Sequence, residues 1–323
     1  MKAYVIDKYG SGLHLRHLAD PVPGPREVLV RVTATSVNPY DWHHMRGEPR
    51  VARLLPGLGT TRPLISVPGC DVAGRVAALG PGVTAFRPGD PVYALADEGG
   101  FGEYTVVAED LLAPRPGISA TDAAAVPMAG VTALLALGSC AGGSVLVNGA
   151  SGGVGTFAVQ LAKAAGAHVT AVCGTRNLGL LRKIGADEVI DYGAVDFTRA
   201  GRRYDLLLDI AGGHPGRALR RALTRTGTLV VVGGPAGRWL QPAGHAFGTL
   251  ATAPFVRQRI RLADAVHCPD KKALLAQLTA LMRAGAVTPV LDRQFAFDEI
   301  PAAVRYQEQG HATGKVVVTV GAD

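Results

Sequence analysis

Charged residues are scarce in this chain. Asp, Glu, Lys and Arg together make up 18% of the 323 residues, whereas hydrophobic residues make up 48%. Disordered chains show the opposite balance, with low hydrophobicity and high net charge. The composition therefore excludes disorder, and a length of about twice a typical domain predicts a soluble protein of two domains.

Cysteine is also scarce, and no two cysteines form a C-x-x-C pair. The four are Cys70, Cys140, Cys173 and Cys268. Disulfide frameworks and structural zinc knuckles both need cysteines at close and regular spacing. We therefore expect neither, and predict reduced, mostly buried thiols instead.

The N-terminal residues lack the apolar core of a signal peptide. Residues 1–8 form a short strand-like run with charges at both ends, which predicts a cytoplasmic protein. The stretch between Asp122 and Lys163 has no charged residue and is long enough to cross a bilayer. Pro127, several glycines and Asn148 interrupt it, so we expect buried strands and helices there.

Basic residues exceed acidic ones by a small margin. The chain has 33 Lys and Arg against 26 Asp and Glu, a formal net charge of +7. This balance suits phosphorylated ligands, but the basic residues are scattered and no nucleic-acid partner is expected. One short cluster, Arg257 to Arg261, lacks the interleaved aromatic residues that stack on bases. We expect a helix face or loop there, with contact to an anionic carrier as the alternative.

The pattern of apolar runs divides the chain into two kinds of structure. Up to about residue 115, short strand-like runs such as 27–32 and 104–107 alternate with Pro-Gly turns, which predicts a β-barrel. From Ala123 strands alternate with helices, which predicts a doubly wound parallel sheet and an α/β fold class. Its expected strands are 145–147, 169–172, 188–190, 206–209 and 228–232. A helix over 271–283 and a last strand over 315–320 follow.

The most informative segment is an apolar strand that runs into the glycine-rich turn GASGGVG at 149–155. Gly152 would let the backbone approach a pyrophosphate, and Gly155 would let the next helix pack closely on the strand. The helix N-terminus offers N–H groups and a positive dipole end to the anion. Ala150 replaces the first glycine of the strict pattern. The turn, with Ser151, Gly153 and Val154, predicts a dinucleotide site and hence a redox enzyme.

The end of the second expected strand indicates which dinucleotide binds. NAD sites carry an acidic residue about 20 residues beyond the glycines. Residues 172–176 contain no acid but contain Thr175 and Arg176, which suit a 2′-phosphate. We therefore predict NADPH, with Gly174, Tyr192 and Gly233 completing the cofactor site.

Many ordered segments resemble one family. They are SVNPYD at 36–41, VPGCDVAG at 67–74, RPGDPVY at 87–93, AAAVP at 123–127, the glycine turn, GADEVIDY at 185–192 and GKVV at 314–317. The chain resembles the medium-chain dehydrogenase/reductase superfamily, in its zinc-independent quinone-oxidoreductase-like branch. The resemblance implies a GroES-like catalytic domain over 1–127 and 267–323, a Rossmann domain over 128–266, NADPH in the cleft and a homodimer.

The resemblance also indicates whether a catalytic metal ion is expected. Zinc members of the superfamily bind the catalytic ion through a Cys and a later His-Glu pair, and carry a four-cysteine lobe. Here those positions hold Asn38 and the pair Cys70-Asp71, and the lobe is absent, so no metal is expected. The alternative is a rearranged zinc site in which Cys70 and Asp71 act with His43 or His44.

Without metal, hydride from NADPH would go to a carbon that is already electrophilic, in a quinone or an α,β-unsaturated carbonyl. The family's active-site segment places three candidate catalytic residues here. We expect His43 to donate a proton, with Tyr40 as second candidate and solvent as an alternative, and Asn38 to bind the carbonyl or the nicotinamide ribose. Leu54, Leu55 and Leu58 predict a fairly apolar acceptor pocket. Alternative functions are a carbonyl reductase or alcohol dehydrogenase, and an RNA-binding protein that keeps the NADPH site, as in some zeta-crystallins.

Overall fold

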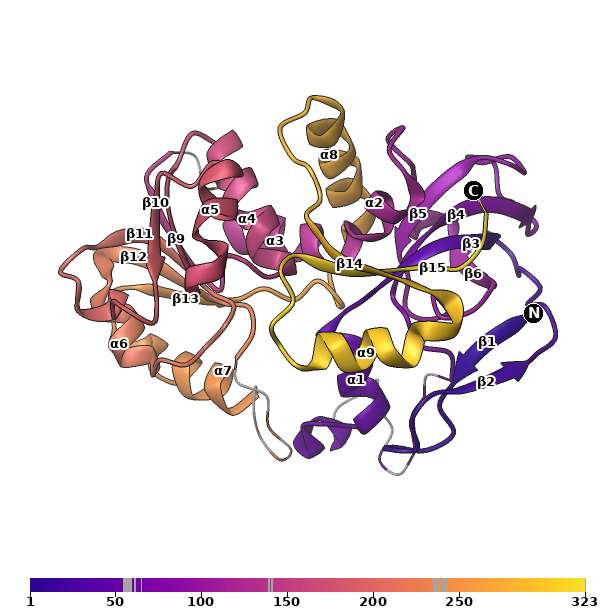
Figure 1. Cartoon of the computed structure of the whole chain (residues 1–323), viewed down its shortest axis with the longest axis horizontal. Helices are drawn as coiled ribbons and strands as arrows, with labels where there is room; N and C mark the ends of the chain where they lie inside the picture. The colour runs from indigo at the N-terminus through magenta and orange to yellow at the C-terminus, as the bar shows by residue number, and fades with distance from the viewer. Residues whose placement is uncertain are drawn as a thin grey trace. The chain divides into compact units, whose positions relative to one another are not determined.

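The computed structural model describes residues 1–54, 60, 62–64, 66–138, 140, 142–234, 237, 239 and 243–322. The chain divides into two compact units (Figure 1). Unit 1 comprises Met1–Val131, Cys268–Ala284 and Pro289–Asp323, and unit 2 comprises Thr132–His267 and Gly285–Thr288. Each unit is described by itself.

Unit 1 is built on a mostly antiparallel sheet in the order β14-β15-β3-β4-β5-β7, with β6 also paired to β3. The last strand of the chain, β15, pairs antiparallel with β3, so the C-terminus completes a sheet that the N-terminal residues begin. A separate hairpin-like pair joins β1 to β2. The strands are β1 (Lys2–Val5), β2 (His14–His17), β3 (Glu27–Val37), β4 (Asp71–Leu79), β5 (Pro91–Leu95), β6 (Tyr104–Ala108), β7 (Leu112–Pro114), β14 (Leu291–Ala296) and β15 (Lys315–Thr319).

Several helices belong to unit 1, and some of them pack on its sheet. Helix α9 packs against α1 and β15, and the Trp42 indole N–H donates to Gln307 Oε1 at 2.8 Å, which ties α1 to α9 (Figure 1). Helix α3 begins in unit 1 and continues into unit 2. The helices are α1 (Pro39–Arg46), η1 (Arg50–Leu54), η2 (Glu109–Leu111), α2 (Ala120–Ala124), α3 (Pro127–Leu137), α8 (Lys271–Arg283), η6 (Phe297–Glu299) and α9 (Ile300–Glu308).

The core of unit 1 includes residues from both ends of the chain. Val37 at the end of β3 and Val316 and Val318 of β15 belong to one buried cluster, together with the fully buried Phe101. Deleting a ring buried in this way costs about 3–5 kcal/mol of folding free energy. Residues near the start and the end of the chain therefore hold each other in place, and both carry site residues described below.

Unit 2 is a six-stranded parallel sheet in the order β10-β9-β8-β11-β12-β13, which is the strand order of a Rossmann fold. Its central strands are continuous apolar runs because both faces are covered. The strands are β8 (Ser144–Asn148), β9 (His168–Cys173), β10 (Glu188–Asp191), β11 (Tyr204–Asp209), β12 (Leu223–Val231) and β13 (Arg259–Leu262). The helices are α4 (Gly153–Ala164), η3 (Thr175–Asn177), α5 (Leu178–Lys183), η4 (Phe197–Arg199), α6 (Gly216–Arg221), α7 (Ala243–Leu250) and η5 (Ala253–Phe255).

The basic cluster at 257–261 does not form the helix face or loop expected from the sequence. Arg259–Leu262 is β13, an edge strand that pairs parallel with β12. The expectation was wrong because the alternation Arg-Ile-Arg-Leu has the period of a strand, and an exposed edge accommodates charged side chains that discourage further strand pairing. Among the described residues the doubly wound sheet therefore has six strands, where the sequence predicts five.

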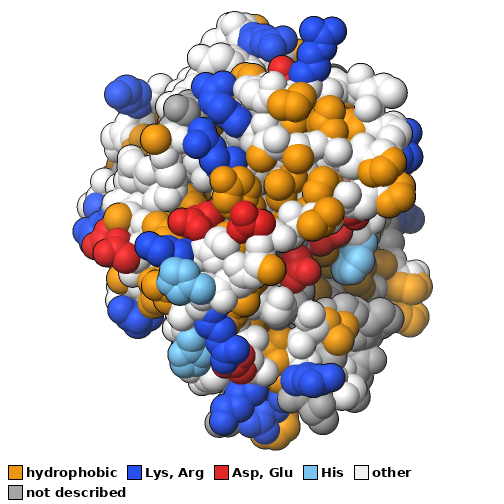
Figure 2. Space-filling model, turned by 90° about the vertical axis from the view of Figure 1, so that its right-hand side faces the viewer, with side chains coloured by type: hydrophobic (Ala, Val, Ile, Leu, Met, Phe, Trp, Pro, Cys, Tyr) orange, Lys and Arg blue, Asp and Glu red, His pale blue; other side chains and the backbone are white. Residues whose placement is uncertain are grey.

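The uncharged stretch from 123 to 162 contains α3, β8 and most of α4, as predicted, rather than one long helix. Within the described ranges, no helix has both the length and the apolar character needed to cross a membrane. Figure 2 shows one face of the molecule, where apolar side chains gather in the upper half above several acidic ones, while basic side chains are spread around them.

Candidate functional site

The residues predicted to bind the cofactor meet at one edge of unit 2. The glycine turn follows β8, residues 174–176 follow β9, Tyr192 follows β10, and Gly233 lies just beyond β12. Because these strands are parallel, their carboxyl ends share an edge. Strand β8 lies between β9 and β11, so the chain order reverses beside it, and such a switch point is where open α/β sheets bind ligands.

The glycines of the turn have different physical roles. A Cβ on Gly155 would lie 2.6 Å from Ala150 Cα and closer still to Gly149 O, so only glycine lets α4 pack against β8. A Cβ on Gly152 would come no nearer than 3.7 Å to any atom of the described chain. Nothing in the described part of the chain therefore requires glycine at 152. The space beside the Gly152 backbone is open, as expected where a ligand approaches the backbone.

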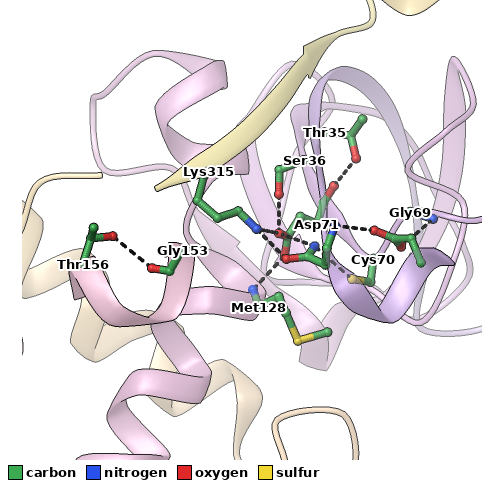
Figure 3. Close-up of polar contacts among 11 residues, drawn as sticks. Thr35, Ser36, Gly69, Cys70, Asp71, Met128, Gly153, Thr156 and Lys315 are labelled. Carbon is green, nitrogen blue, oxygen red and sulfur yellow. Dashed lines mark hydrogen bonds and ion pairs between the residues drawn. The ribbon is translucent and has the colours of Figure 1, made fainter. Parts of the chain in front are cut away.

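The N-terminus of α4 suits an anion. The helix begins at Gly153 and runs for 12 residues, and its N-cap is Gly152, which has no side chain to bond the first N–H groups. The Thr156 hydroxyl donates to Gly153 O at 3.0 Å and so faces its own backbone (Figure 3). Unpaired N–H groups and the helix dipole together favour a phosphate at this position.

An acidic residue that the sequence analysis missed lies at the predicted 2′-phosphate site. The Thr175 hydroxyl donates to Asp191 Oδ2 at 2.5 Å, and Gly193 N donates to Oδ1 at 2.9 Å. These hydrogen bonds, that of Thr175 first, hold the pKa of Asp191 below its usual value, so the carboxyl is ionised. Asp191 ends β10 directly beside Cys173 at the end of β9. Asp191 directly precedes the predicted site residue Tyr192, and the pairing of two neighbouring parallel strand ends is the signal that could have identified it.

A second unpredicted group lies at the same edge. Asp209, fully buried at the end of β11, accepts from His245 Nε2 at 2.9 Å and from Asn148 Nδ2 at 2.7 Å. The hydrogen bond to Asp209 raises the pKa of His245 above its ordinary value. Nearby, a Cβ on Gly233 would lie 2.5 Å from Ile210 O, so glycine allows this close approach of β12 to β11.

In unit 1 the predicted residue Asn38 is buried, and both ends of its side-chain amide are hydrogen-bonded within the protein. It is 3% exposed. Its amide nitrogen donates to Asp71 Oδ2 at 2.9 Å and to Cys70 Sγ at 3.5 Å, and its amide oxygen accepts from Lys315 Nζ at 2.5 Å. Figure 3 shows three of these partners, Cys70, Asp71 and Lys315, close together. Both ends of the amide are used inside the protein, so this arrangement does not present Asn38 to a carbonyl or a ribose.

His43 is held as a neutral imidazole. Its Nδ1 lies 2.7 Å from Glu48 O, and because a carbonyl only accepts, we assign the ring proton to Nδ1. Burial lowers the pKa of His43 to about 4. The ring also stacks on Trp42, with 3.7 Å between the ring centroids. At neutral pH, Nε2 therefore carries a lone pair and can only accept a hydrogen bond, whereas the predicted role needs a donor.

Tyr40 differs from His43 in that it can donate a hydrogen bond. Its ring packs against His44, with centroids 4.0 Å apart. Burial first, and then the neighbouring Cys70 and Asp41, raise the pKa of Tyr40, so the phenol keeps its proton. Within the described residues its hydroxyl has no hydrogen-bond partner, although it is half-buried. Of the three predicted catalytic residues, Tyr40 is the one with a hydrogen to donate.

The residues at the zinc positions do not fit a metal ion. Lys315 Nζ lies 3.1 Å from Asp71 Oδ2, so an ammonium ion already neutralises the carboxylate. Burial and the nearby carboxylates raise the pKa of Cys70 well above its usual value, so the thiol is neutral here. Across the described part of the chain, no three His, Cys, Asp or Glu side chains form a group able to hold a metal, so the rearranged site with His43 or His44 is not assembled there. Leu55 and Leu58 of the expected acceptor pocket lie outside the described residues.

Two family models match the chain. The alcohol dehydrogenase GroES-like domain matches residues 24–117, and the zinc-binding dehydrogenase model matches residues 184–318. With the GroES-like sheet of unit 1 and the Rossmann sheet of unit 2, these matches show that the chain belongs to the medium-chain dehydrogenase/reductase superfamily, in its quinone-oxidoreductase-like branch. The predicted family and fold class are confirmed.

Named relatives cover nearly the whole chain. A chloroplast envelope quinone oxidoreductase homolog of Arabidopsis thaliana is 36% identical, with 98% of each chain covered. The mitochondrial NAD(P)H oxidoreductase RTN4IP1 of Mus musculus is also 36% identical, over 99% of this chain and 89% of its own. A 2-methylene-furan-3-one reductase of Solanum lycopersicum is 32% identical, over 98% and 79%. The structure of the quinone oxidoreductase from Coxiella burnetii superposes with a TM-score of 0.86 at 30% identity, with 99% of each chain covered. The chain is thus an oxidoreductase with a nicotinamide cofactor.

Proposed function

We propose that this chain is an NADPH-dependent oxidoreductase that reduces quinones or α,β-unsaturated carbonyls without a metal ion. The observation that carries the proposal is the buried Lys315 ammonium beside Asn38 and Asp71, at the positions where zinc members hold their ion. The names of the Arabidopsis and tomato relatives, a quinone oxidoreductase homolog and the reductase of an enone, support this choice of acceptor.

The residues of unit 2 fit the cofactor. The open backbone surface at Gly152 and the N-terminus of α4 would hold the pyrophosphate. Exposed Arg176 and Tyr192 would hold the 2′-phosphate, since a guanidinium forms strong charge-assisted bonds to phosphate. When bound, NADPH supplies the hydride that the reaction needs.

The residues of unit 1 would act on the acceptor. Hydride addition to an enone or a quinone leaves negative charge on an oxygen, and a donor aimed at that oxygen stabilises the transition state. Tyr40 is protonated and free to donate, so we assign it this role and leave the final proton to water. His43, neutral with Nδ1 bonded to Glu48 O, would shape the site beside it. We expect a small-molecule acceptor and a homodimer.

The proposal is tested by following NADPH oxidation against matched acceptors. A panel of quinones, enones, simple aldehydes and ketones, and alcohols with NADP⁺, should show turnover with the first two groups alone. Elemental analysis should show no stoichiometric zinc, and chelator should leave turnover unchanged. Chelator-sensitive alcohol oxidation, or NADPH binding with turnover of no acceptor, would overturn it.

A further inference from the structure

Lys315 is a buried cation far from any predicted site residue in the sequence. Its side chain is 4% exposed, at the start of β15. Its ammonium group donates to Asn38 Oδ1 at 2.5 Å and to Asp71 Oδ2 at 3.1 Å (Figure 3). A buried charge is unfavourable unless it is paired and hydrogen-bonded. The two contacts satisfy that condition, and the shorter one is to the neutral amide rather than to the carboxylate.

Asp71 holds several elements of unit 1 together. Its Oδ2 accepts from Ser36 Oγ at 2.5 Å, from Asn38 Nδ2 and from Lys315, and its Oδ1 accepts from Met128 N at 2.7 Å. These donors come from β3, from the residue before α1, from β15 and from the start of α3. Of these donors, Lys315 carries the positive charge that neutralises Asp71. That neutralisation does not explain why the ammonium group also contacts Asn38.

Asn38 in turn determines how α1 begins. Its N–H donates to Asp41 Oδ2 at 2.7 Å, and its carbonyl accepts from Asp41 N at 3.1 Å. Helix α1 starts at the next residue, Pro39, whose ring fixes φ. With the amide held by Lys315 and Asp71, every polar group of Asn38 has a partner. The first turn of α1 is therefore fixed from its N-terminal side.

Tyr40 is the second residue of that turn. No hydrogen bond to its hydroxyl is seen in the described chain, so the direction of the ring depends on the backbone and on packing against His44. We propose that Lys315 is a positioning residue for Tyr40: its ammonium fixes the Asn38 amide, and Asn38 fixes the turn that carries the phenol. The inference rests on the proposed role of Tyr40 as donor to the acceptor oxygen.

A double-mutant cycle tests the inference. Lys315→Met should lower kcat for an enone by about 10²-fold, the scale for a displacement of about 1 Å at a reacting group, with a smaller change in KM. In a Tyr40→Phe background the same substitution should lower kcat less than about threefold, because the group it positions is already absent. Equal losses in the two backgrounds would overturn the inference.

Two further variants separate positioning from support of the fold. Ser36→Ala removes another donor to Asp71 Oδ2 but leaves the bond from Lys315 to Asn38. It should lower the urea midpoint of unfolding and keep kcat within about threefold of wild type. Lys315→Met combined with Asp71→Asn avoids an unpaired buried charge. If that pair recovers wild-type kcat, Lys315 only neutralises Asp71 and the inference is wrong; if kcat stays low, it is supported.

A spectroscopic readout does not depend on turnover. With 3-fluorotyrosine incorporated, the ¹⁹F signal of Tyr40 is identified by its loss in Tyr40→Phe. Lys315→Met should shift or broaden this signal, and Ser36→Ala should leave it in place. An unchanged signal in Lys315→Met would overturn the positioning role. If wild type reduces no quinone or enone, the proposed function fails, and this measurement still decides the position of Tyr40.

Discussion

The Thr175 hydroxyl donates a 2.5 Å hydrogen bond to the ionised carboxylate of Asp191, across the adjacent ends of β9 and β10. While that bond is made, the Thr175 oxygen has no hydrogen left for a phosphate. An anion beside the expected 2′-phosphate site also repels the phosphate, whereas the ribose hydroxyls of NADH can donate to a carboxylate. Asp191 therefore opposes the preference for NADPH that Arg176 is expected to give.

We expect substitutions of Arg176 and of Asp191 to change the preference for NADPH over NADH in opposite directions. Arg176→Ala should weaken NADPH binding by about 1.5–3 kcal/mol, the scale of a lost hydrogen bond to a charged group, and NADH binding much less. Asp191→Asn should strengthen NADPH binding by no more than about fivefold, as one exposed and solvent-screened repulsive charge is removed. Titration calorimetry with both cofactors measures this. Equal changes for NADPH and NADH would refute the assignment of the pocket.

The two glycines at the start of α4 should respond differently to alanine. Gly152→Ala should fold with nearly wild-type stability, because its Cβ would meet no atom of the described residues closer than 3.7 Å, but should weaken NADPH binding by tenfold or more if the pyrophosphate lies there. Gly155→Ala should lower the free energy of unfolding by about 1–3 kcal/mol, because its Cβ would collide with the backbone at 150. Urea unfolding without cofactor, and NADPH fluorescence titration, separate the two effects. Normal NADPH affinity in Gly152→Ala would remove the pyrophosphate from this turn.

Local sequence patterns predicted much of this fold. The helix at 271–283 has the predicted bounds, and the strand predicted over 169–172 extends one residue further at each end, because each has a clear apolar period and clear ends. The glycine turn was recognisable because its spacing reflects a local steric need. Strand β13 was missed although Arg-Ile-Arg-Leu alternates with the period of a strand, because four residues that include two arginines are also compatible with an exposed loop.

The residues that were missed depend on contacts between distant parts of the chain. Lys315 lies 277 residues from the amide it contacts, and His245 lies 36 residues from Asp209. No local pattern contains such pairings. The proton on His43 depends on a carbonyl five residues away and on burial, so sequence identified the residue but not its protonation state.

Substitutions at Tyr40 and His43 should separate the two candidate donors. Tyr40→Phe removes only the hydroxyl and should lower enone turnover by about 10²-fold, the scale for loss of a positioned donor. His43→Phe should change it by less than about threefold, because the neutral ring offers a lone pair rather than a proton. Quinone reduction should depend less on Tyr40, because hydride addition to a quinone leaves a phenolate that its aromatic ring stabilises, and this anion needs a hydrogen-bond donor less than an enolate does. Steady-state kinetics at pH 7 with one acceptor of each class measures this, and a large loss confined to His43→Phe would return the donor role to the imidazole.

The pair of His245 and Asp209 should make stability depend on pH. The hydrogen bond to Asp209 raises the pKa of His245 in the folded state above the unfolded value of 6.5, so the folded protein holds this proton more tightly. The resulting stabilisation is complete below pH 6.5, and it is lost as the pH rises through the higher folded-state pKa. His245→Gln keeps a side-chain N–H for Asp209 but cannot titrate. The free energy of unfolding of wild type, minus that of the variant, should therefore fall between pH 6 and pH 9 in urea titrations at fixed ionic strength. A difference that stays constant or rises across this range would show that His245 is not protonated in the folded protein.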